Sequence, residues 1–530
     1  MTQNMSSESN DGRTVRLQIP ASNSDETTQL PSHKVTRQLA LDKIVNKIGM
    51  GRFQKQLLLL CGLGWLSDNM WIQCVVVILP RVKVHYNVNE KFIGVLSSSM
   101  ALGMMIGALF WGVLSDSYGR KKAFNFTLLF TALFGILSAF SQSFFQLCIL
   151  LFLTGFSVGG NMPVDGALFL EFIPKTHQYL LTSLSVFFSF GAVLTSILAY
   201  LVLPPNSCID SSGKTCNVQE QNNGWRYMLG ILGLLTFIMF ICRILFFRLQ
   251  ESPKFLISQD HIHDAVVVLR KIAIINGCSI QIKASDIQSA TINSNYTETF
   301  SEDNSPQSQV GFFSDPIQWF MLKLRPIEPL FSRKWIKTTI LVWSIWTLVA
   351  FAYCMFNVFL PTYLEWLGLS GDEDTDGISL IREVLRDYVI YSVCGIPGSL
   401  FGSYLIETIL GRKGSMALAT FGTALAVFMF STVSSRSGEV ISSAMVSFLS
   451  TLNYAVIYGY TPEVFEVKLR GTACGISSAL GRIAGIIAPI VTGVLLSINI
   501  SIPLYLSASL FALSGICMIL LPIETRGRQA

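Results

Sequence analysis

The chain has 530 residues, of which 51% are hydrophobic and only 13% are charged. A soluble domain usually carries about 25% charged residues, so much of the surface of this protein must face something other than water. The formal net charge of +5 is mild, and nucleic acid is not expected as a partner. The eleven Cys include no Cys-x-x-Cys motif and no Cys/His cluster with zinc-binding spacing, so neither a metal site nor a cofactor is predicted.

Twelve apolar stretches run along the chain after a polar start. Residues 1–45 are rich in Ser, Thr, Asn and Gln and lack the apolar core of a signal peptide, which predicts a disordered tail. Each apolar stretch is close to the roughly 20 residues that a helix needs to cross a lipid bilayer. The predicted spans lie near 57–79, 92–114, 123–141, 145–170, 178–203, 225–247, 336–359, 387–406, 414–433, 439–461, 472–498 and 502–521.

A polar segment divides these spans into two sets of six. A first bundle is predicted at 46–250 and a second at 336–525, with a central loop at 251–335 between them. The composition of the loop predicts a flexible linker with one amphipathic helix at 258–275. Lys and Arg are more frequent in the short segments on the side of the two termini, which predicts that both termini and the central loop are cytosolic.

Three further expectations concern the surroundings of the protein. The sequon at Asn295 falls on the predicted cytosolic side, so it is not expected to be glycosylated. Cys208 and Cys216 share a loop on the opposite side, where a disulfide can persist, but the sequence leaves two free thiols equally open. Plasma membrane, vacuole and endoplasmic reticulum all remain open as the location.

The two sets of spans repeat one order of acids and bases. After the second span, Asp116 precedes Gly119 and Arg120, and after the eighth span Glu407 precedes the same Gly-Arg-Lys triplet at Arg412. In each set one acid then closes the fourth helix and another follows the sixth; these acids are Glu171 with Glu251, and Glu463 with Glu524. Such a repeat is typical of alternating-access transporters. We therefore predict an all-α integral membrane protein with twelve transmembrane helices in two pseudo-symmetric six-helix bundles.

Two further motifs make a family resemblance plain. Gly159-Gly160-Asn161-Met-Pro163-Val-Asp165 lies in the fourth span, and Tyr460-Thr-Pro462-Glu463 closes the tenth, followed by Arg470. With the repeated loops, the chain resembles the major facilitator superfamily, in its sugar-porter, organic-ion and synaptic-vesicle-glycoprotein-like branches, and fungal-type members in particular. The similarity covers residues 50–525. It implies alternating access by two rocking bundles.

The resemblance also implies a cytosolic gate. Charged clamps of this kind hold the outward-open state and break as the cytosolic side opens. The residues carried over are Asp116, Gly119, Arg120, Glu171, Glu251, Glu407, Arg412, Glu463, Arg470 and Glu524. One departure concerns coupling. Many proton-coupled relatives carry an Arg in the fourth helix where this chain has Leu151, so proton coupling by that residue is excluded.

Ionisable residues inside a predicted span are costly and are functional candidates. Asp68 lies near mid-membrane in the first span, where it would carry a proton, face a cation, or serve as a fixed hydrogen-bonded or ion-paired acid. Arg482 in the eleventh span is suited to a carboxylate or phosphate, or to a salt bridge with another helix, Asp68 included. Asp165 is assigned to the gate or to substrate binding. Arg243, near a helix end, is expected to snorkel to the lipid headgroups and has no assigned role.

Polar and aromatic residues of the spans are candidates to line a central cavity. They are Asn161, Tyr353, Asn357, Tyr388, Tyr391, Asn453, Tyr454 and Tyr458. Asn161, Tyr353, Asn357, Asn453 and Tyr454 of this set join Asp68, Arg482 and Asp165 in the predicted site for substrate and protons.

Three classes of function were weighed. The first is a secondary transporter of a small organic solute, either a proton symporter of an organic anion or, if Asp68 and Arg482 pair permanently, a sugar-like uniporter or exchanger. The second is a non-transporting membrane sensor on the same fold. An enzyme is not expected, because it would need a nucleophile and base or a metal cluster, and the five His lie outside the membrane core. ATP-driven transport is not expected either, because no nucleotide-binding Walker sequence is present. The expected partners are the lipid bilayer, a small-molecule substrate and, in the symporter, protons, with one chain sufficient for function.

Overall fold

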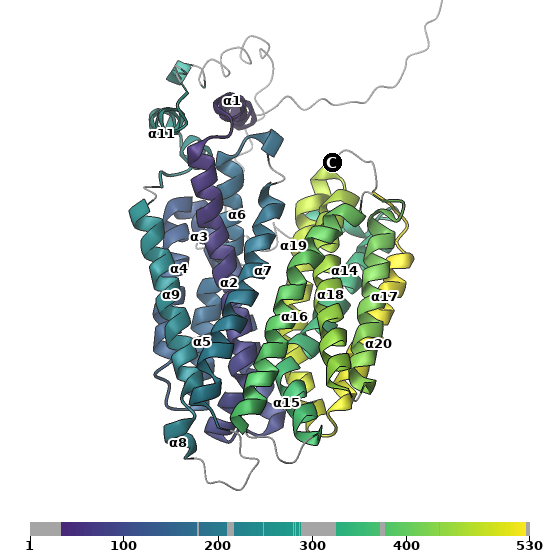
Figure 1. Cartoon of the computed structure of the whole chain (residues 1–530). Coiled ribbons are helices and arrows are strands. Elements are labelled where there is room, and N and C mark those ends of the chain that lie inside the picture. Colours follow the sequence, from purple (N-terminus) through teal and green to yellow (C-terminus); the bar gives the residue numbers. More distant parts are fainter. Residues whose placement is uncertain are drawn as a thin grey trace, which may run out of the picture.

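The computed structural model describes residues 33–177, 180–208, 217–246, 249–278, 325–371, 377–406, 408–433 and 435–525, with most of 280–287. In these residues the regular elements are helices, and they form two bundles side by side (Figure 1). Glu407, Cys216 and Asn295, which carry predictions from the sequence, lie outside the described residues.

Six spanning segments build each bundle. The first consists of α2 (Arg52–Tyr86), α3 (Glu90–Tyr118), α4 (Arg120–Ser138), α5 (Phe144–Val158) continued by α6 (Asn161–Phe172), α7 (Leu180–Val202) and α9 (Gly224–Phe246). The second consists of α14 (Ile336–Asn357) continued by α15 (Leu360–Gly371), α16 (Gly377–Leu405), α17 (Gly411–Thr432), α18 (Arg436–Val464), α19 (Val467–Leu496) and α20 (Ser501–Ile519).

Ten of these twelve segments are long and apolar enough to cross a membrane. The other two, α4 and α16, carry several charges near their starts, and they pack against the apolar helices of their own bundles. The predicted fold class, an all-α membrane protein with twelve transmembrane helices in two bundles, is confirmed in the described residues.

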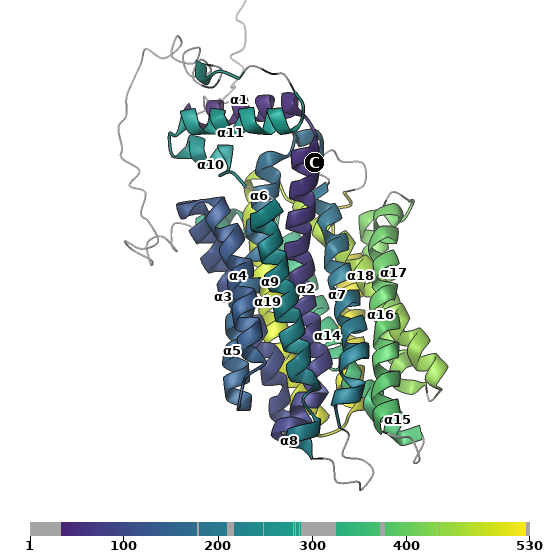
Figure 2. The same cartoon turned by 60° about the vertical axis from the view of Figure 1, so that its left-hand side comes forward.

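A layer of shorter helices covers one end of the first bundle (Figure 2). It contains α1 (His33–Ile48), α10 (Pro253–Ser258) and α11 (Ile262–Ile275). We call this end the α1 face and the opposite end, which carries the C-terminal part of α15, the α15 face. The remaining short helices are η1 (Lys175–His177), η2 (Pro204–Asn206), α8 (Val218–Gln221) and η3 (Arg325–Phe331).

The layer differs from the expected disordered tail. Residues 33–45 belong to α1, and Leu41 and Val45 are buried in one apolar cluster with Phe53 of α2 and Leu269 of α11. The amphipathic helix predicted at 258–275 corresponds to α10 and α11. The prediction failed because it was based on the polar composition of this segment alone. The helix α1 is stabilised by packing against other helices, which the local composition does not reveal.

Asp42 ties α1 to this layer. One carboxylate oxygen lies 2.9 Å from Lys254 Nζ and the other 3.1 Å from Lys175 Nζ. Burial tends to raise the pKa of Asp42, but hydrogen bonds from Lys254 and Lys175 outweigh that effect and lower the pKa below its ordinary value of 3.8. The charged form of Asp42 therefore stabilises the layer at neutral pH.

The substitution Asp42→Asn is expected to loosen α1 at pH 7 and to have little effect in acid. A lowered pKa contributes stability above the unfolded value of 3.8, and that contribution is lost as the pH falls through the lower folded value. Amide hydrogen exchange of α1 should be about two- to fivefold faster in the variant at pH 7, with the difference shrinking below pH 3.8. Asp264→Asn on the exposed side of α11 is the control, and equal exchange in all three proteins at pH 7 would contradict the assignment.

Candidate functional site

A charged cluster surrounds the turn between α3 and α4 at the α1 face. Glu251 accepts hydrogen bonds from the backbone N–H groups of Arg120 at 2.8 Å and Lys121 at 3.3 Å, so its carboxylate caps the N-terminus of α4. The Arg120 side chain donates from Nε to Glu171 at 3.2 Å and also pairs with Asp116. Gly119 has φ +106°, and a Cβ on it would lie 2.5 Å from a Glu251 oxygen, so glycine is required there.

The second bundle repeats this cluster at the turn before α17. Glu524 accepts from the backbone N–H groups of Arg412 at 3.0 Å and Lys413 at 3.1 Å. The Arg412 side chain donates from Nε to Glu463 at 2.9 Å. The side chain of Arg470, which the sequence grouped with these residues, forms no hydrogen bond or ion pair with the described part of the chain, and its buried Nε has no partner there. The expected pairing of Arg470 is therefore not formed.

The two bundles meet toward the α15 face and part toward the α1 face. On α3, a Cβ on Gly94 would lie 1.9 Å from the Pro489 carbonyl oxygen of α19, and the Ser98 hydroxyl donates to the Ile486 carbonyl at 2.7 Å. Nearer the α1 face, a Cβ on Gly112 of α3 would meet nothing within 4 Å. The separation of the two bundles at this end is visible in Figure 1.

Both charged clusters are formed although the α1 face is open. Each lies within its own bundle, and the described hydrogen bonds and ion pairs between bundles are elsewhere, at the α15 face and in the middle of the membrane region. The resemblance implied clamps that break when this face opens, whereas here Arg120 still pairs with Glu171 and Arg412 with Glu463. The clusters therefore hold the helices of one bundle together in this state.

Asp68 lies in the interior of the first bundle. Asn161, the first residue of α6, donates from Nδ2 to Asp68 Oδ1 at 2.8 Å. Asp68 Oδ2 is buried and has no hydrogen-bond partner among the described residues, and the same holds for Asn161 Oδ1. The sequence named both residues, and the structure brings them into direct contact.

A second carboxylate lies one helical turn along α6. Asp165 forms an ion pair with Arg243 at 2.7 Å, and both side chains are fully buried. Arg243 also donates to the Phe124 carbonyl at 2.5 Å and lies 3.7 Å over the Phe124 ring. The expected snorkelling of Arg243 is wrong, because the guanidinium points inward to Asp165.

The space for the Asp165–Arg243 ion pair beside α2 depends on one glycine of that helix. A Cβ on Gly64 would lie 1.9 Å from Asp165 Oδ2 and 2.4 Å from an Arg243 nitrogen. Sequence reasoning missed the Asp165–Arg243 ion pair and the role of Gly64 beside it. Gly64 stands four residues before Asp68, and Asp165 stands four residues after Asn161. That shared spacing was the available signal, because residues four apart lie on one helix face.

Arg482 approaches the same region from the second bundle. Its guanidinium donates to the Met104 carbonyl of α3 at 3.1 Å, and the side chain is partly exposed. Arg482 is within electrostatic reach of Asp68 and Tyr458, but it forms no ion pair with Asp68 in the described residues. Tyr458 is 56% exposed and packs edge-on against Trp346. Arg482 lies near Tyr458 and bonds to the other bundle, so we infer that the exposed surface of Tyr458 faces the space between the two bundles.

The other predicted cavity residues form a second polar group. Tyr391 donates to Asn357 at 3.0 Å, and Tyr388 of α16 donates to Gln73 of α2, which joins the two bundles. Tyr353 stacks edge-on against Tyr454 with ring centroids 5.5 Å apart. The sequence analysis did not single out Gln73, although it follows Asn69 by one helical turn and bonds to it at 3.3 Å.

Asn453 of α18 stands apart from these networks. It is fully buried, and neither atom of its amide has a hydrogen-bond partner in the described chain. On the α15 side, Cys208 is disulfide-bonded. In the part of the chain that the structure describes, no group of His, Cys, Asp and Glu is arranged to hold a metal ion.

Two six-helix bundles with repeated charged turns, joined at one face and parted at the other around buried charges, define a membrane transporter fold. The sequence matches the Major Facilitator Superfamily over residues 59–382 and 388–530. The chain belongs to this family, and the predicted family is confirmed.

Individual relatives cover almost the whole chain. It is 34% identical over 499 residues to an uncharacterized MFS-type transporter of Schizosaccharomyces pombe, which covers 92% of this chain and 88% of the relative. It is 33% identical to the MFS siderochrome iron transporter 1 of Ceriporiopsis subvermispora, with coverage of 92% and 90%. Its fold is similar to the partially occluded inward-open conformation of the xylose transporter XylE from E. coli, with TM-score 0.65, 15% identity and coverage of 90% and 100%.

Proposed function

We propose that this protein is a proton-coupled symporter of a small organic anion, with Asp68 as the proton carrier and Arg482 as the anion anchor. The observation that carries the proposal is the charge balance around Asp68. Arg243 is already paired with Asp165, so among the described residues Asp68 has no cation in direct contact and no partner for one of its carboxylate oxygens. A proton supplies the missing positive charge.

The same arrangement couples the proton to an anion. Arg482 lies across the bundle interface within electrostatic reach of Asp68, so a charged Asp68 repels an anion that approaches Arg482. Protonation of Asp68 removes that repulsion and leaves the guanidinium free to attract a carboxylate. Proton and anion therefore favour each other's binding, which is the thermodynamic requirement for symport.

We infer that the α1 face is cytosolic, as the excess of Lys and Arg on that side indicates, and that this state is open to the cytosol. The charged clusters with Arg120 and Arg412, each inside one bundle, then stiffen that bundle as it rocks. A single chain contains both bundles and is proposed to be the transporting unit.

The test is uptake into proteoliposomes driven by a pH gradient. A panel of small carboxylates, sugars, amino acids and organic cations is compared in wild type, Asp68→Asn, Arg482→Ala and the surface control Asp264→Asn. We expect accumulation of one carboxylate that falls by about 100-fold or more in Asp68→Asn and Arg482→Ala and is unchanged in the control. Exchange of the same carboxylate without a gradient should survive in Asp68→Asn. Uptake that ignores the gradient and survives Asp68→Asn would refute the proton role.

A second candidate, a neutral sugar-like substrate carried by a uniporter or exchanger, is favoured by a separate observation. The tyrosine and amide groups at Tyr391, Asn357 and Gln73, with the unpartnered amide of Asn453, are hydrogen-bonding groups without charge. Sugar uptake that is indifferent to Arg482→Ala would select this alternative. Binding without flux for every panel compound would instead select a sensor.

A further inference from the structure

One ion pair joins the two bundles in the described part of the chain. It links Arg81 of α2 with Glu365 of α15, at the α15 face. Every other ion pair between described side chains stays within one bundle and its attached helices. Arg81 and Glu365 are therefore the charged groups that must separate whenever this face opens.

Arg81 is anchored on its own bundle by further bonds. Its guanidinium donates to the Cys208 carbonyl at 2.8 Å, and its backbone carbonyl accepts from the Asn222 side chain at 2.9 Å. Cys208 is itself disulfide-bonded, so Arg81 is held from the loop that follows α7. The Arg81 side chain is 3% exposed and the Glu365 side chain 17%, which leaves the pair weakly screened by solvent.

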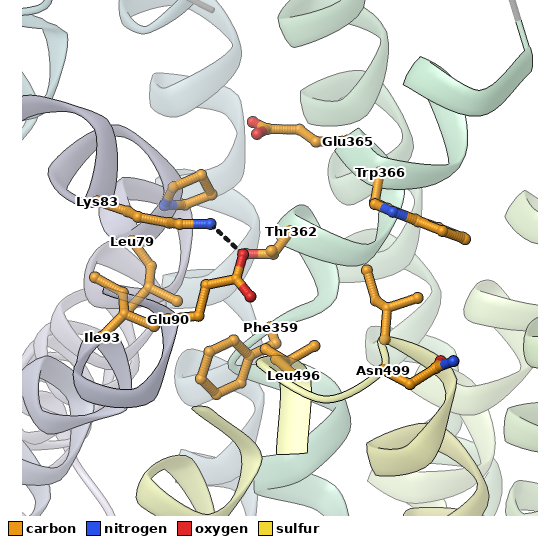
Figure 3. Close-up of a pocket in the computed structure, with 12 residues that line it drawn as sticks. Leu79, Lys83, Glu90, Ile93, Phe359, Thr362, Glu365, Trp366, Leu496 and Asn499 are labelled. Atoms are coloured by element: carbon orange, nitrogen blue, oxygen red, sulfur yellow. Dashed lines mark hydrogen bonds and ion pairs between the residues drawn. The ribbon is translucent and has the colours of Figure 1, made fainter. Parts of the chain in front are cut away.

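A cavity lies beside this ion pair, between the two bundles (Figure 3). Its volume is about 400 Å³, and its wall includes Glu365 and Phe359 from the second bundle and Leu79 and Ile93 from the first. The cavity places Glu365 at the edge of a space that can hold water, although the apolar residues below it are buried. Water can therefore reach the carboxylate once the pair separates.

The same face offers a matched comparison. Lys83 Nζ lies 2.6 Å from Glu90 Oε1, and Figure 3 shows this pair in the wall of the same cavity as Glu365. Lys83 and Glu90 both belong to the first bundle and are 34% and 45% exposed. This pair does not have to break when the face opens, although Lys83 also lies within electrostatic reach of Glu365. Glu90 is therefore the member of the pair that suits a control.

We propose that the Arg81–Glu365 ion pair is the latch that holds the α15 face closed and sets the balance between the two states of the transporter. The two charges attract strongly in the closed state because they are largely desolvated, and they gain water only after the bundles part. The inference concerns the change of state, and it stands or falls independently of the proposed proton and anion.

The experiment is hydrogen exchange of the full chain in lipid nanodiscs, read by mass spectrometry at both faces. Wild type is compared with Glu365→Gln, Arg81→Lys, and the controls Glu90→Gln and Lys334→Gln, each of which breaks an ion pair within one bundle. For Glu365→Gln we expect faster exchange around 79–93 and 359–366, together with slower exchange at the turns that carry Arg120 and Arg412. A shift of the state ratio by roughly tenfold or more toward the form open at the α15 face is expected.

Opposite changes at the two faces separate a latch from a local structural role, since local loosening would raise exchange at the α15 face alone. Arg81→Lys keeps the charge but loses the fork that serves both Glu365 and Cys208, so it should give an intermediate shift. If Glu365→Gln does not fold, the Arg81→Lys variant tests the latch in its place. Unchanged exchange at the α1 face, or an equal shift in Glu90→Gln or Lys334→Gln, would overturn the proposal.

Discussion

Arg243→Gln is expected to destabilise the first bundle by about 3–5 kcal/mol, the largest effect on folding among the charged residues discussed here. The substitution leaves the Asp165 carboxylate fully buried, with its ion-pair partner gone and its other oxygen already without a partner. The cation–π contact with Phe124 and the hydrogen bond to its carbonyl are lost as well. The measurement is the thermal midpoint of the purified protein in detergent, read by the loss of the folded peak on size exclusion.

The double variant supplies the control for this prediction. Asp165→Asn together with Arg243→Gln removes both charges, so it should be more stable than Arg243→Gln alone, by roughly 1–3 kcal/mol. Lys334→Gln breaks an exposed ion pair with Glu466 and should cost less than about 1 kcal/mol. If Arg243→Gln unfolds no earlier than Lys334→Gln, the ion pair does not contribute as the geometry indicates.

The fold could be predicted because lipid imposes a local rule. A helix must satisfy its own backbone across the hydrocarbon layer, so a run of about 20 apolar residues already reports a span. The repeated turns were readable for a similar reason, since Gly119 with Arg120 and the Gly-Arg pair at Arg412 recur in equivalent places. What the repeat did not reveal is that Glu251 and Glu524 cap helices through backbone N–H groups.

The candidate site was only partly predictable because its contacts join distant segments. Asp68 and Asn161 were both named from depth and polarity, yet their hydrogen bond depends on how α6, which continues α5, packs against α2. Arg243 was assigned to the headgroups because it stands near a helix end. The space that Gly64 leaves in α2 is what lets it turn inward, and that space is a property of packing between helices.

Gly94→Ala is expected to reduce transport by about 100-fold or more while leaving the protein folded. The added Cβ would lie 1.9 Å from the Pro489 carbonyl oxygen and 2.5 Å from its carbon, both backbone atoms of the other bundle. Backbone of a packed helix cannot move aside as a flexible side chain can, so α3 and α19 could not close at the α15 face. The form open at that face has no such contact and remains accessible, which blocks the cycle without unfolding either bundle.

Three glycines of α3 separate this effect from ordinary destabilisation. Gly112→Ala adds a methyl group that meets nothing within 4 Å, so uptake and thermal midpoint should both match wild type. Gly103→Ala places its Cβ 2.1 Å from the Phe152 carbonyl of the same bundle, so the thermal midpoint should fall whichever state is adopted. Only Gly94→Ala should lose uptake with a preserved midpoint and gain hydrogen exchange at the α15 face. If its midpoint falls as far as that of Gly103→Ala, the contact between α3 and α19 supports the fold and is not one that opens and closes during transport.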